Sequence, residues 1–366
     1  MKTQQRQFLD LIRFALMGKD LPTCKIHQTE WADLLKMAKE QAVVGLLYAA
    51  LEKMPQDRRP QREALLDFFS IVLQIEQANH KLNTSICSLF AIYRKLGGNP
   101  MLLKGQGVGK CYLHPEWRNS GDIDVFVSQN FDKVHEWTIA NGEEAQEYEP
   151  DFDKHVNFKW DGVTVENHFL LARFYNRRTD RSMQAITQEG LKIEAPLLVQ
   201  IEGQDIELLP PTLGLLQLIT HFSHHLMDWG VGIRQLCDIV MYMHTYHRQI
   251  NAERLNRWLT ELDLARSAGA VATIGVRYLG LPTEEVPLHT KQGERYADKL
   301  LQLVMESGNF GCIELGAYRR PLLWRIQFYG LHCIKSYQLM PREVRSVFLG
   351  KAKHVLHRLK KGDTNI

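Results

Sequence analysis

The chain has 366 residues, of which 45% are hydrophobic and 24% charged, and its formal net charge is +3. These are the values of an average soluble globular protein, so a disordered chain is excluded, and the length predicts two or three subdomains. No apolar run approaches the length that spans a bilayer, and the N-terminus leads into an amphipathic helix rather than a signal peptide. We therefore expect a cytoplasmic protein with no membrane partner.

The first hundred residues have helical periodicity. Apolar residues at 8–16 predict one helix, and Thr29 is expected to cap a second helix, which continues through 43–51. The segment 60–96 has no Gly or Pro after Pro60 and keeps the helical period throughout, which predicts one long helix. The run Gly97-Gly98-Asn99-Pro100 should end that helix.

The next segment, 102–127, is predicted to form a strand, a glycine turn, a helix of about two turns and a second strand. Side chains alternate between the faces of a strand, so Asp122 and Asp124 should point the same way while Ile123 and Val125 face the core. The sequence therefore predicts two carboxylates side by side.

Adjacent carboxylates raise each other's pKa unless a positive charge lies between them. Oxygen ligands of this kind suit Mg²⁺ or Mn²⁺, which promote phosphoryl transfer by holding the attacking and leaving oxygens. The pattern thus favours a metal site at Asp122 and Asp124. The alternative is an Asp-X-Asp sequence at a strand edge that is merely solvated.

A second polar face is predicted after a helix at 130–140 and an acidic loop at 143–153. The runs 156–160 and 163–168 alternate in polarity and are joined by Asp161-Gly162, a strong β-hairpin signal. The residues that this alternation places on the polar face are Asn157, Lys159, Thr164, Glu166 and His168.

The remainder of the chain is predicted to be helical, at 212–227, 232–247, 252–262, 265–279, 291–306 and from 321 to about 360 with a break near Pro341. His221, His224, His225 and Asp228 fall along one stripe of the first of these helices. Histidines in such a position are more often hydrogen-bonded residues at the edge of a core than zinc ligands. Arg234 and Asp238, spaced i and i+4, are expected to pair on the next helix.

The motif at 102–124 resembles the polymerase-β-like nucleotidyltransferase superfamily: a Gly turn opens a helix, and Gly121-Asp122-Ile123-Asp124 follows about sixteen residues later. The residues Leu103-Lys104-Gly105, Tyr112, Pro115 and Arg118 are similar to those of its bacterial branch known as the uncharacterised nucleotidyltransferase family. The resemblance implies an α+β fold, with a mixed sheet and helices, flanked by helical segments. We expect an N-terminal helical segment at 1–99, the nucleotidyltransferase core at 100–208 and a C-terminal helical domain at 209–366.

The resemblance also implies a reaction, in which a nucleoside monophosphate moves from a nucleoside triphosphate, ATP among the candidates, to a hydroxyl-type acceptor with release of pyrophosphate. Asp122 and Asp124 would hold Mg²⁺ or Mn²⁺, and Glu166 would be the third metal ligand and activate the acceptor. His168, two residues later on the same face, is expected to orient the carboxylate or contact substrate.

Nucleotide binding is expected around Lys104-Gly105-Gln106, which stands where the superfamily more often has Gly-Ser. Because that hydroxyl is missing, phosphate binding should depend on Lys104, Gln106 or Ser120. Arg118 is expected to add positive charge near the triphosphate, and the pair Arg234 and Asp238 to line the nucleotide or acceptor pocket.

Two other functions remain open. The missing Gly-Ser suits a catalytically idle nucleotide-binding or protein-interaction module. From Arg319 onward the chain has eleven Lys or Arg against two acidic residues, which suits transfer to RNA, although a solvated helix face is the favoured interpretation. The acceptor, a small molecule or a protein side chain, is not identified by the sequence. The six cysteines are scattered singly and are expected to be free thiols, most of them buried.

Overall fold

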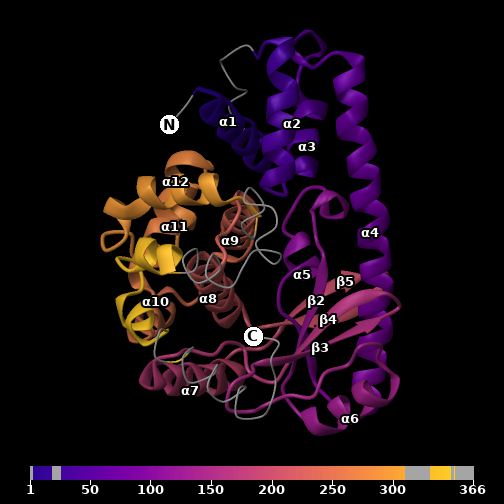
Figure 1. Ribbon diagram of the computed structural model, residues 1–366, viewed down its shortest axis with the longest axis vertical. Coiled ribbons are helices and arrows are strands. Elements are labelled where there is room, and N and C mark those ends of the chain that lie inside the picture. Colours follow the sequence, from indigo (N-terminus) through magenta and orange to yellow (C-terminus); the bar gives the residue numbers. More distant parts are fainter. Residues whose placement is uncertain (1–2, 19–25, 310–329, 348–349, 351–366) are drawn as a thin grey trace.

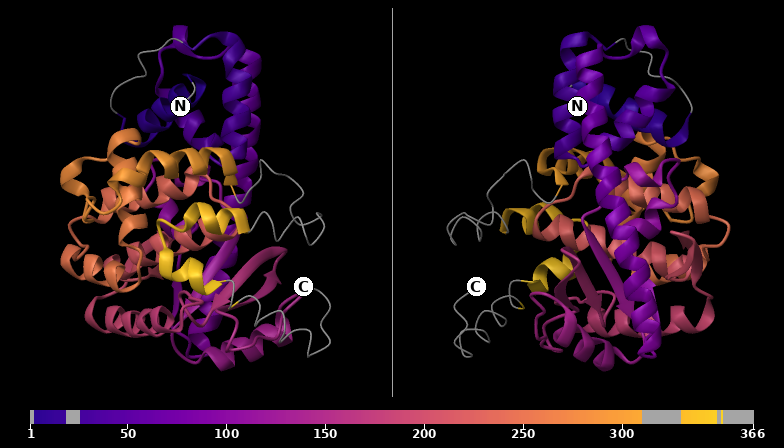
Figure 2. Two further views of the ribbon diagram at one scale, coloured as in Figure 1. Left: turned by 60° about the vertical axis from the view of Figure 1, so that its left-hand side comes forward. Right: turned by 90° about the vertical axis from the view of Figure 1, so that its right-hand side faces the viewer.

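A computed structural model describes residues 3–18, 26–309, 330–347 and 350. Three helices, α1 (Thr3–Met17), α2 (Trp31–Glu40) and α3 (Val44–Lys53), form the N-terminal part. Apolar residues on one face of each helix are buried, among them Phe8 and Trp31. The helix α4 (Arg62–Lys95) then runs from these helices along the molecule to the sheet (Figures 1 and 2).

The centre of the fold is a mixed six-stranded sheet with the order β3-β4-β2-β1-β6-β5. Its strands are β1 (Pro100–Leu102), β2 (Asp122–Val127), β3 (His155–Trp160), β4 (Val163–His168), β5 (Leu197–Ile201) and β6 (Gln204–Leu208). The strands β2 and β4 are parallel neighbours, while β3 and β4 form an antiparallel hairpin. This order places the two predicted carboxylate strands side by side.

The two faces of the sheet have different roles. Apolar side chains of α4, including Ile86 and Phe90, pack on one face against Ile123 and Val165, and α6 (Phe131–Asn141) adds Val134. The opposite face carries the polar residues of β2 and β4. Because α4 and α6 pack on the apolar face, the alternation of each strand fixes which side chains face away from α4.

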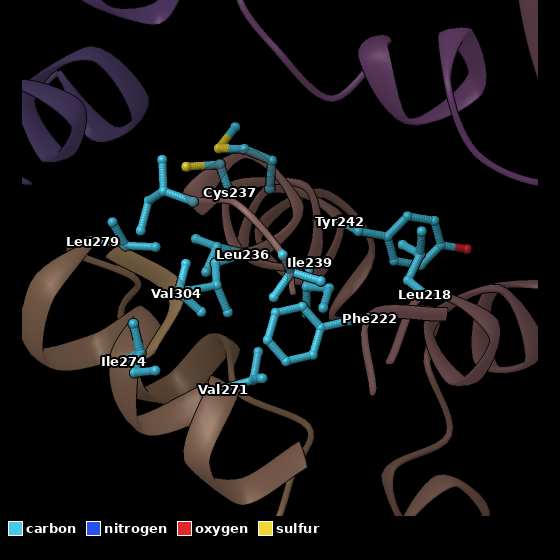
Figure 3. Close-up of a cluster of buried hydrophobic side chains, with 14 of the residues drawn as sticks. Leu218, Phe222, Leu236, Cys237, Ile239, Tyr242, Val271, Ile274, Leu279 and Val304 are labelled. Atoms are coloured by element: carbon cyan, nitrogen blue, oxygen red, sulfur yellow. The ribbon is translucent and has the colours of Figure 1, made fainter. Parts of the chain in front are cut away.

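The C-terminal helices are α8 (Pro211–Asp228), α9 (Ile233–Tyr246), α10 (Ala252–Glu261), α11 (Ala265–Tyr278) and α12 (Ala297–Ser307). They share one apolar core with the N-terminal helices. Figure 3 shows Phe222 of α8, Leu236 of α9 and Ile274 of α11 among the apolar side chains gathered there. Burial of this kind contributes about 2 kcal/mol for each large apolar side chain.

The structure confirms the expected α+β class, the long helix, the second core strand and the hairpin. Asp161 and Gly162 both have positive φ, 50° and 69°, as a two-residue hairpin turn requires. Two expectations are wrong in detail. Thr29 lies inside a 3-10 turn, Gln28–Glu30, and does not cap α2. The helix expected to have about two turns, α5 (Gln106–Gly109), has one, followed by a 3-10 turn at Pro115–Trp117.

Sequence reasoning missed three elements before α8: α7 (Arg177–Ile193) and the hairpin of β5 and β6. Asn176 caps α7 by accepting a hydrogen bond from the backbone N–H of Thr179. Of the helix expected from 321 to about 360, the structure describes only residues 330–347 and 350, and most of the basic C-terminal residues fall outside this part of the chain.

The four cysteines within the described ranges, Cys87, Cys111, Cys237 and Cys333, are buried. Cys24 and Cys312 lie outside those ranges. Within the ranges that the structure describes, every helix is too short or too polar to cross a membrane.

Candidate active site

The carboxylates predicted to converge do so. In the parallel register of β2 and β4, Asp124 lies opposite Glu166, and Asp122 stands two residues earlier on the same face. One carboxylate oxygen from each of the three residues lies within 4.8 Å of the other two. Asp124 is almost fully buried, whereas 38% of the Asp122 side chain is exposed, so the group opens to solvent on the Asp122 side.

A lysine ammonium lies between two of these carboxylates. Lys104 Nζ is 2.7 Å from Asp124 Oδ2 and 3.1 Å from Asp122 Oδ2. Burial lowers the pKa of Lys104, but the charges of Asp124, Asp122 and Glu166 outweigh burial and hold it above the ordinary value. Lys104 therefore stays charged and neutralises part of the negative charge of the group.

Two histidines adjoin the opposite side of the group. His168 Nε2 is 3.1 Å from Asp124 Oδ1 and 3.3 Å from Glu166 Oε2, and His155 Nδ1 is 3.4 Å from the same Glu166 oxygen. Burial raises the pKa of Glu166, but its hydrogen bond with His168 and the charge of Lys104 lower it well below the ordinary value. Burial and neighbouring His168 lower the pKa of His155 to about 3, so its imidazole is neutral at pH 7.

The donor set fits a divalent cation. Three convergent carboxylates are hard oxygen ligands of the kind that Mg²⁺ and Mn²⁺ take. The ammonium of Lys104 between Asp122 and Asp124 indicates that positive charge is favoured at this position even without a metal.

A narrow pocket adjoins the carboxylates and brings together most of the predicted nucleotide-binding residues. It lies between the sheet and the helices α8 and α9, and it is lined by Lys104, Gly105, Arg118, Ser120, Asp122, Leu218, His221, Arg234, Gln235, Asp238 and Ile239. Gly105 has a φ of 60°, a conformation that glycine adopts without strain. The pocket is therefore built from both the sheet region and the C-terminal helices.

Arg234 is the cation that α9 contributes to this pocket. Its Nε is buried without a hydrogen-bond partner in the described part of the chain, and its Nη2 has only a long contact of 3.5 Å with Asn309 Oδ1. Burial and the nearby charge of Arg118 lower the pKa of Arg234. Its guanidinium thus retains hydrogen-bonding capacity that an anionic ligand can satisfy.

The expected pairing of Arg234 with Asp238 along one helix is wrong for the described residues. Asp238 instead accepts two hydrogen bonds of 2.7 Å from Arg118, which precedes β2, and one of 2.8 Å from the Tyr112 hydroxyl. The Arg118 charge lowers the pKa of Asp238 although burial raises it. Arg118 Nη1 also donates to Ser120 Oγ at 2.6 Å. Arg118 therefore joins α9 to the segment before β2 and orients Ser120.

The side chain of Gln106 lies away from the carboxylates. It is buried, and its Nε2 donates to the backbone oxygen and Oδ1 of Asn79 on α4. The Asn79 amide in turn donates to the backbone oxygens of Glu116 and Arg118. Gln106 and Asn79, the latter not singled out in the sequence, hold the turn that leads into β2.

A family model described as "Uncharacterised nucleotidyltransferase" matches residues 27–280 of this sequence, which include β2, β4, α8 and α9. The chain belongs to this family. One solved structure, of an antigenic nucleotidyltransferase-like protein from Paracoccidioides brasiliensis, is similar over 50% of this chain and 86% of that chain, at 14% identity and a TM-score of 0.32. No curated protein matches the sequence.

The three histidines of the predicted stripe lie on α8, and one of them, His221, lines the pocket. The rings of His221 and His225 are 4.3 Å apart, and His224 packs edge-on against Phe174. Burial lowers the pKa of all three, that of His224 to about 4 and that of His225 to about 3. Within the described ranges, the groups placed to hold a metal do not include these histidines. They are neutral residues at the edge of the core.

Proposed function

We propose that this nucleotidyltransferase family member moves a nucleoside monophosphate from a nucleoside triphosphate to an acceptor hydroxyl and releases pyrophosphate. The observation that carries this proposal is the convergence of Asp122, Asp124 and Glu166 beside a pocket lined by three basic side chains. The need for a nucleoside triphosphate favours the cytoplasm as the place of the reaction.

The proposed roles follow from position. Asp122, Asp124 and Glu166 would hold Mg²⁺ or Mn²⁺, which when bound neutralises charge that develops on the phosphate oxygens. Glu166 is ionised, so its carboxylate can accept a hydrogen bond from the acceptor hydroxyl and orient the attacking oxygen. The proton leaves the hydroxyl through Glu166 to solvent as the new ester bond forms and the bond to pyrophosphate breaks.

Binding of the triphosphate would depend on the basic and hydroxyl side chains of the pocket. Arg234 supplies an unpaired guanidinium edge, and Lys104 becomes available to phosphate once a divalent cation neutralises its carboxylates. Ser120 can donate its hydroxyl hydrogen, because its oxygen already accepts from Arg118. The charges of Arg118 and Asp238 neutralise each other, so this pair would hold the pocket residues in place rather than bind phosphate.

A second candidate is an idle module that binds nucleotide or protein without catalysis. The observation that favours it is the Lys104 ammonium between Asp122 and Asp124, which supplies positive charge at the place of a metal. In such a module the acidic residues would be a structural ion-pair group. Nucleotide binding would then be independent of divalent cations.

The test uses each nucleoside triphosphate labelled at either the α- or the γ-phosphate, with Mg²⁺ and a cell extract as the source of acceptor. We expect α-label, and not γ-label, to become attached to an acceptor. Asp122→Asn should reduce this transfer by about a thousandfold, several kcal/mol of transition-state stabilisation, and should abolish the Mg²⁺-dependent rise in melting temperature with triphosphate. Asp122 is preferred to Asp124 because it is the more exposed.

Asp132→Asn is the matched control, because Asp132 is an exposed carboxylate on α6 away from the pocket. It should transfer label and bind triphosphate as the unmodified protein does. If triphosphate raises the melting temperature equally in EDTA and in Mg²⁺, and no triphosphate labels an acceptor, the proposed transfer is wrong and the idle module is supported.

A further inference from the structure

A second group of ligand atoms lies next to the three carboxylates. His155 on β3 and His168 on β4 are directly opposed in the hairpin, and Glu166 lies two residues before His168 on the same face. One ligand atom from each of the three residues lies within 4.8 Å of the other two. The group contains two imidazoles and one carboxylate, a combination that differs in chemistry from the carboxylate group beside it.

Both ring nitrogens of His168 face oxygens that accept hydrogen bonds: Nδ1 faces a backbone carbonyl, and Nε2 faces two carboxylates. Nδ1 lies 3.3 Å from the backbone oxygen of Leu170, and a carbonyl oxygen can only accept, so Nδ1 carries a proton and donates it to this bond. In the neutral ring the lone pair of Nε2 then points toward carboxylate oxygens of Asp124 and Glu166. Three electron pairs that face one another are stable only with a cation between them, either a proton or a metal ion.

His155 adds a further potential metal-ligand atom beside Glu166. Its Nδ1 is buried, lies 3.4 Å from Glu166 Oε2, and has no hydrogen-bond partner within the described ranges. The rings of His155 and His168 are 4.8 Å apart at 65° to each other. Two imidazole nitrogens therefore approach the same carboxylate oxygen from different directions.

Lys104 does not occupy the side of the carboxylates on which the two histidines lie. Its ammonium contacts Oδ2 of both Asp122 and Asp124, whereas His168 contacts Oδ1 of Asp124. The two oxygens of Asp124 thus face different neighbours, Lys104 on one side and the imidazole of His168 on the other. A metal on the imidazole side need not displace the lysine.

We propose that His155, Glu166 and His168 form a second metal position that binds a first-row transition ion in preference to Mg²⁺. Imidazole nitrogen is a good ligand for Zn²⁺ and other transition ions, whereas Mg²⁺ takes oxygen ligands and retains water. The position shares Glu166 with the carboxylate group. It deepens the proposed function by giving the centre two unlike metal positions, and this role rests on that function, although metal binding itself does not.

Mn²⁺ is the probe, because its electron paramagnetic resonance signal reports both binding and ligands. Full-length protein freed of metal by a chelator should bind Mn²⁺ without nucleotide, with magnetic coupling to imidazole nitrogen. An equal concentration of Zn²⁺ should displace the Mn²⁺, following the general order of affinities, and a hundredfold excess of Mg²⁺ should not.

His155→Gln is the decisive variant, because His155 is more exposed than His168 and its replacement is less disruptive to the fold. It should weaken Mn²⁺ binding at least tenfold and remove one nitrogen coupling. His114→Gln is the matched control, since His114 also lies beside a carboxylate, that of Glu116, but outside the group. Asp122→Asn should keep the nitrogen coupling.

Mn²⁺ bound without nitrogen coupling, absence of binding, or equal affinity in His155→Gln would overturn the proposal. The two proposals fail separately. Nitrogen-coupled Mn²⁺ in a protein that transfers no nucleotide would refute the proposed function alone, and transfer by a protein whose metal has only oxygen ligands would refute the second position alone.

Discussion

At the scale of single residues, the contact of Lys104 with two carboxylates determines how the site behaves without metal. The ammonium is largely buried and lies within ion-pair distance of Asp122 and Asp124. In a surface group this contact would contribute little, but in a buried group the loss of one partner leaves uncompensated charge. Lys104 therefore stabilises the fold when no divalent cation is bound.

Lys104→Met tests this role. Without divalent cation the variant should lose roughly 3 kcal/mol of unfolding free energy, the lower end of the cost of a broken buried pair. Mg²⁺ should restore much of that loss, because it supplies the missing positive charge, and should stabilise the unmodified protein less. Urea unfolding with and without Mg²⁺ measures both quantities.

Lys159→Met is the control, because Lys159 pairs with Glu144 at the surface. Its unfolding free energy should change by less than about 1 kcal/mol, and Mg²⁺ should make no difference to that change. A loss in Lys104→Met that is the same with and without Mg²⁺ would contradict the assigned role.

The carboxylates were predictable from sequence because strand alternation fixes the direction of each side chain. Asp122 and Asp124 needed only their own strand, whereas Glu166 was placed beside them by the family resemblance, which implies that the two strands are neighbours. The position of His155 was also predictable, because the two-residue turn pairs Trp160 with Val163 and the same register places His155 opposite His168. The Lys104 and Arg118 ion pairs were not predictable, since each depends on how separate segments pack in three dimensions.

At the scale of elements, the long helix and the hairpin have strong local signals, whereas α7 and the β5-β6 hairpin have weak ones. The sequence of α7 is mostly polar, and only a narrow stripe with Met183 and Ile186 is buried. The turn between β5 and β6 uses Glu202 and Gly203, both with positive φ, in place of the more usual Asn-Gly or Asp-Gly. These elements are specified by what they pack against rather than by their own composition.

One contact between elements predicts a pH dependence. Glu343, in the helical segment 341–347, accepts hydrogen bonds from the backbone N–H groups of Tyr175 and Asn176, before α7. Burial raises the pKa of Glu343 from 4.5 to about 7. Because the folded state holds this proton more tightly than the unfolded state, its contribution to stability is greatest below pH 4.5 and is lost as the pH rises to about 7.

Glu343→Gln should remove this dependence. Between pH 5 and pH 8 the unmodified protein should lose about 3 kcal/mol more unfolding free energy than the variant, as the size of the shift implies. Urea unfolding at the two pH values measures the difference. Glu306→Gln, a change of an exposed carboxylate on α12, should behave as the unmodified protein. Parallel pH profiles for Glu343→Gln and the unmodified protein would show that Glu343 is ionised normally.

At the scale of the whole molecule, the pocket is assembled from segments far apart in the sequence. Lys104 and Asp122 come from the sheet region, and Arg234 comes from α9. We propose the boundaries 1–99, 100–208 and 209–366 for the three parts. The helix α4 belongs to the first part but packs on the sheet of the second (Figure 1). The parts are therefore expected to unfold together.

The buried pair of Arg118 and Asp238 joins the second part to the third, and Tyr112 adds a hydrogen bond to the same carboxylate. Asp238→Asn removes the charge that compensates a buried guanidinium, so it should cost about 3 to 5 kcal/mol of unfolding free energy. Replacing the whole group by apolar residues, with Arg118→Met, Asp238→Leu and Tyr112→Phe together, should recover most of that loss, because no charge is then left unpaired.

Urea unfolding followed by tryptophan fluorescence should show one transition for the unmodified protein and for Asp238→Asn, shifted to lower urea in the variant. Glu189→Gln is the control, since Glu189 and Arg257 form a pair between α7 and α10 that is more exposed, and its loss should cost less than about 1 kcal/mol. Two separate transitions, or a cost for Asp238→Asn as small as that of the control, would mean that the pair does not couple the parts. A single shifted transition, with stability restored in the apolar triple variant, identifies the pair as the charge-compensated link that holds the pocket together.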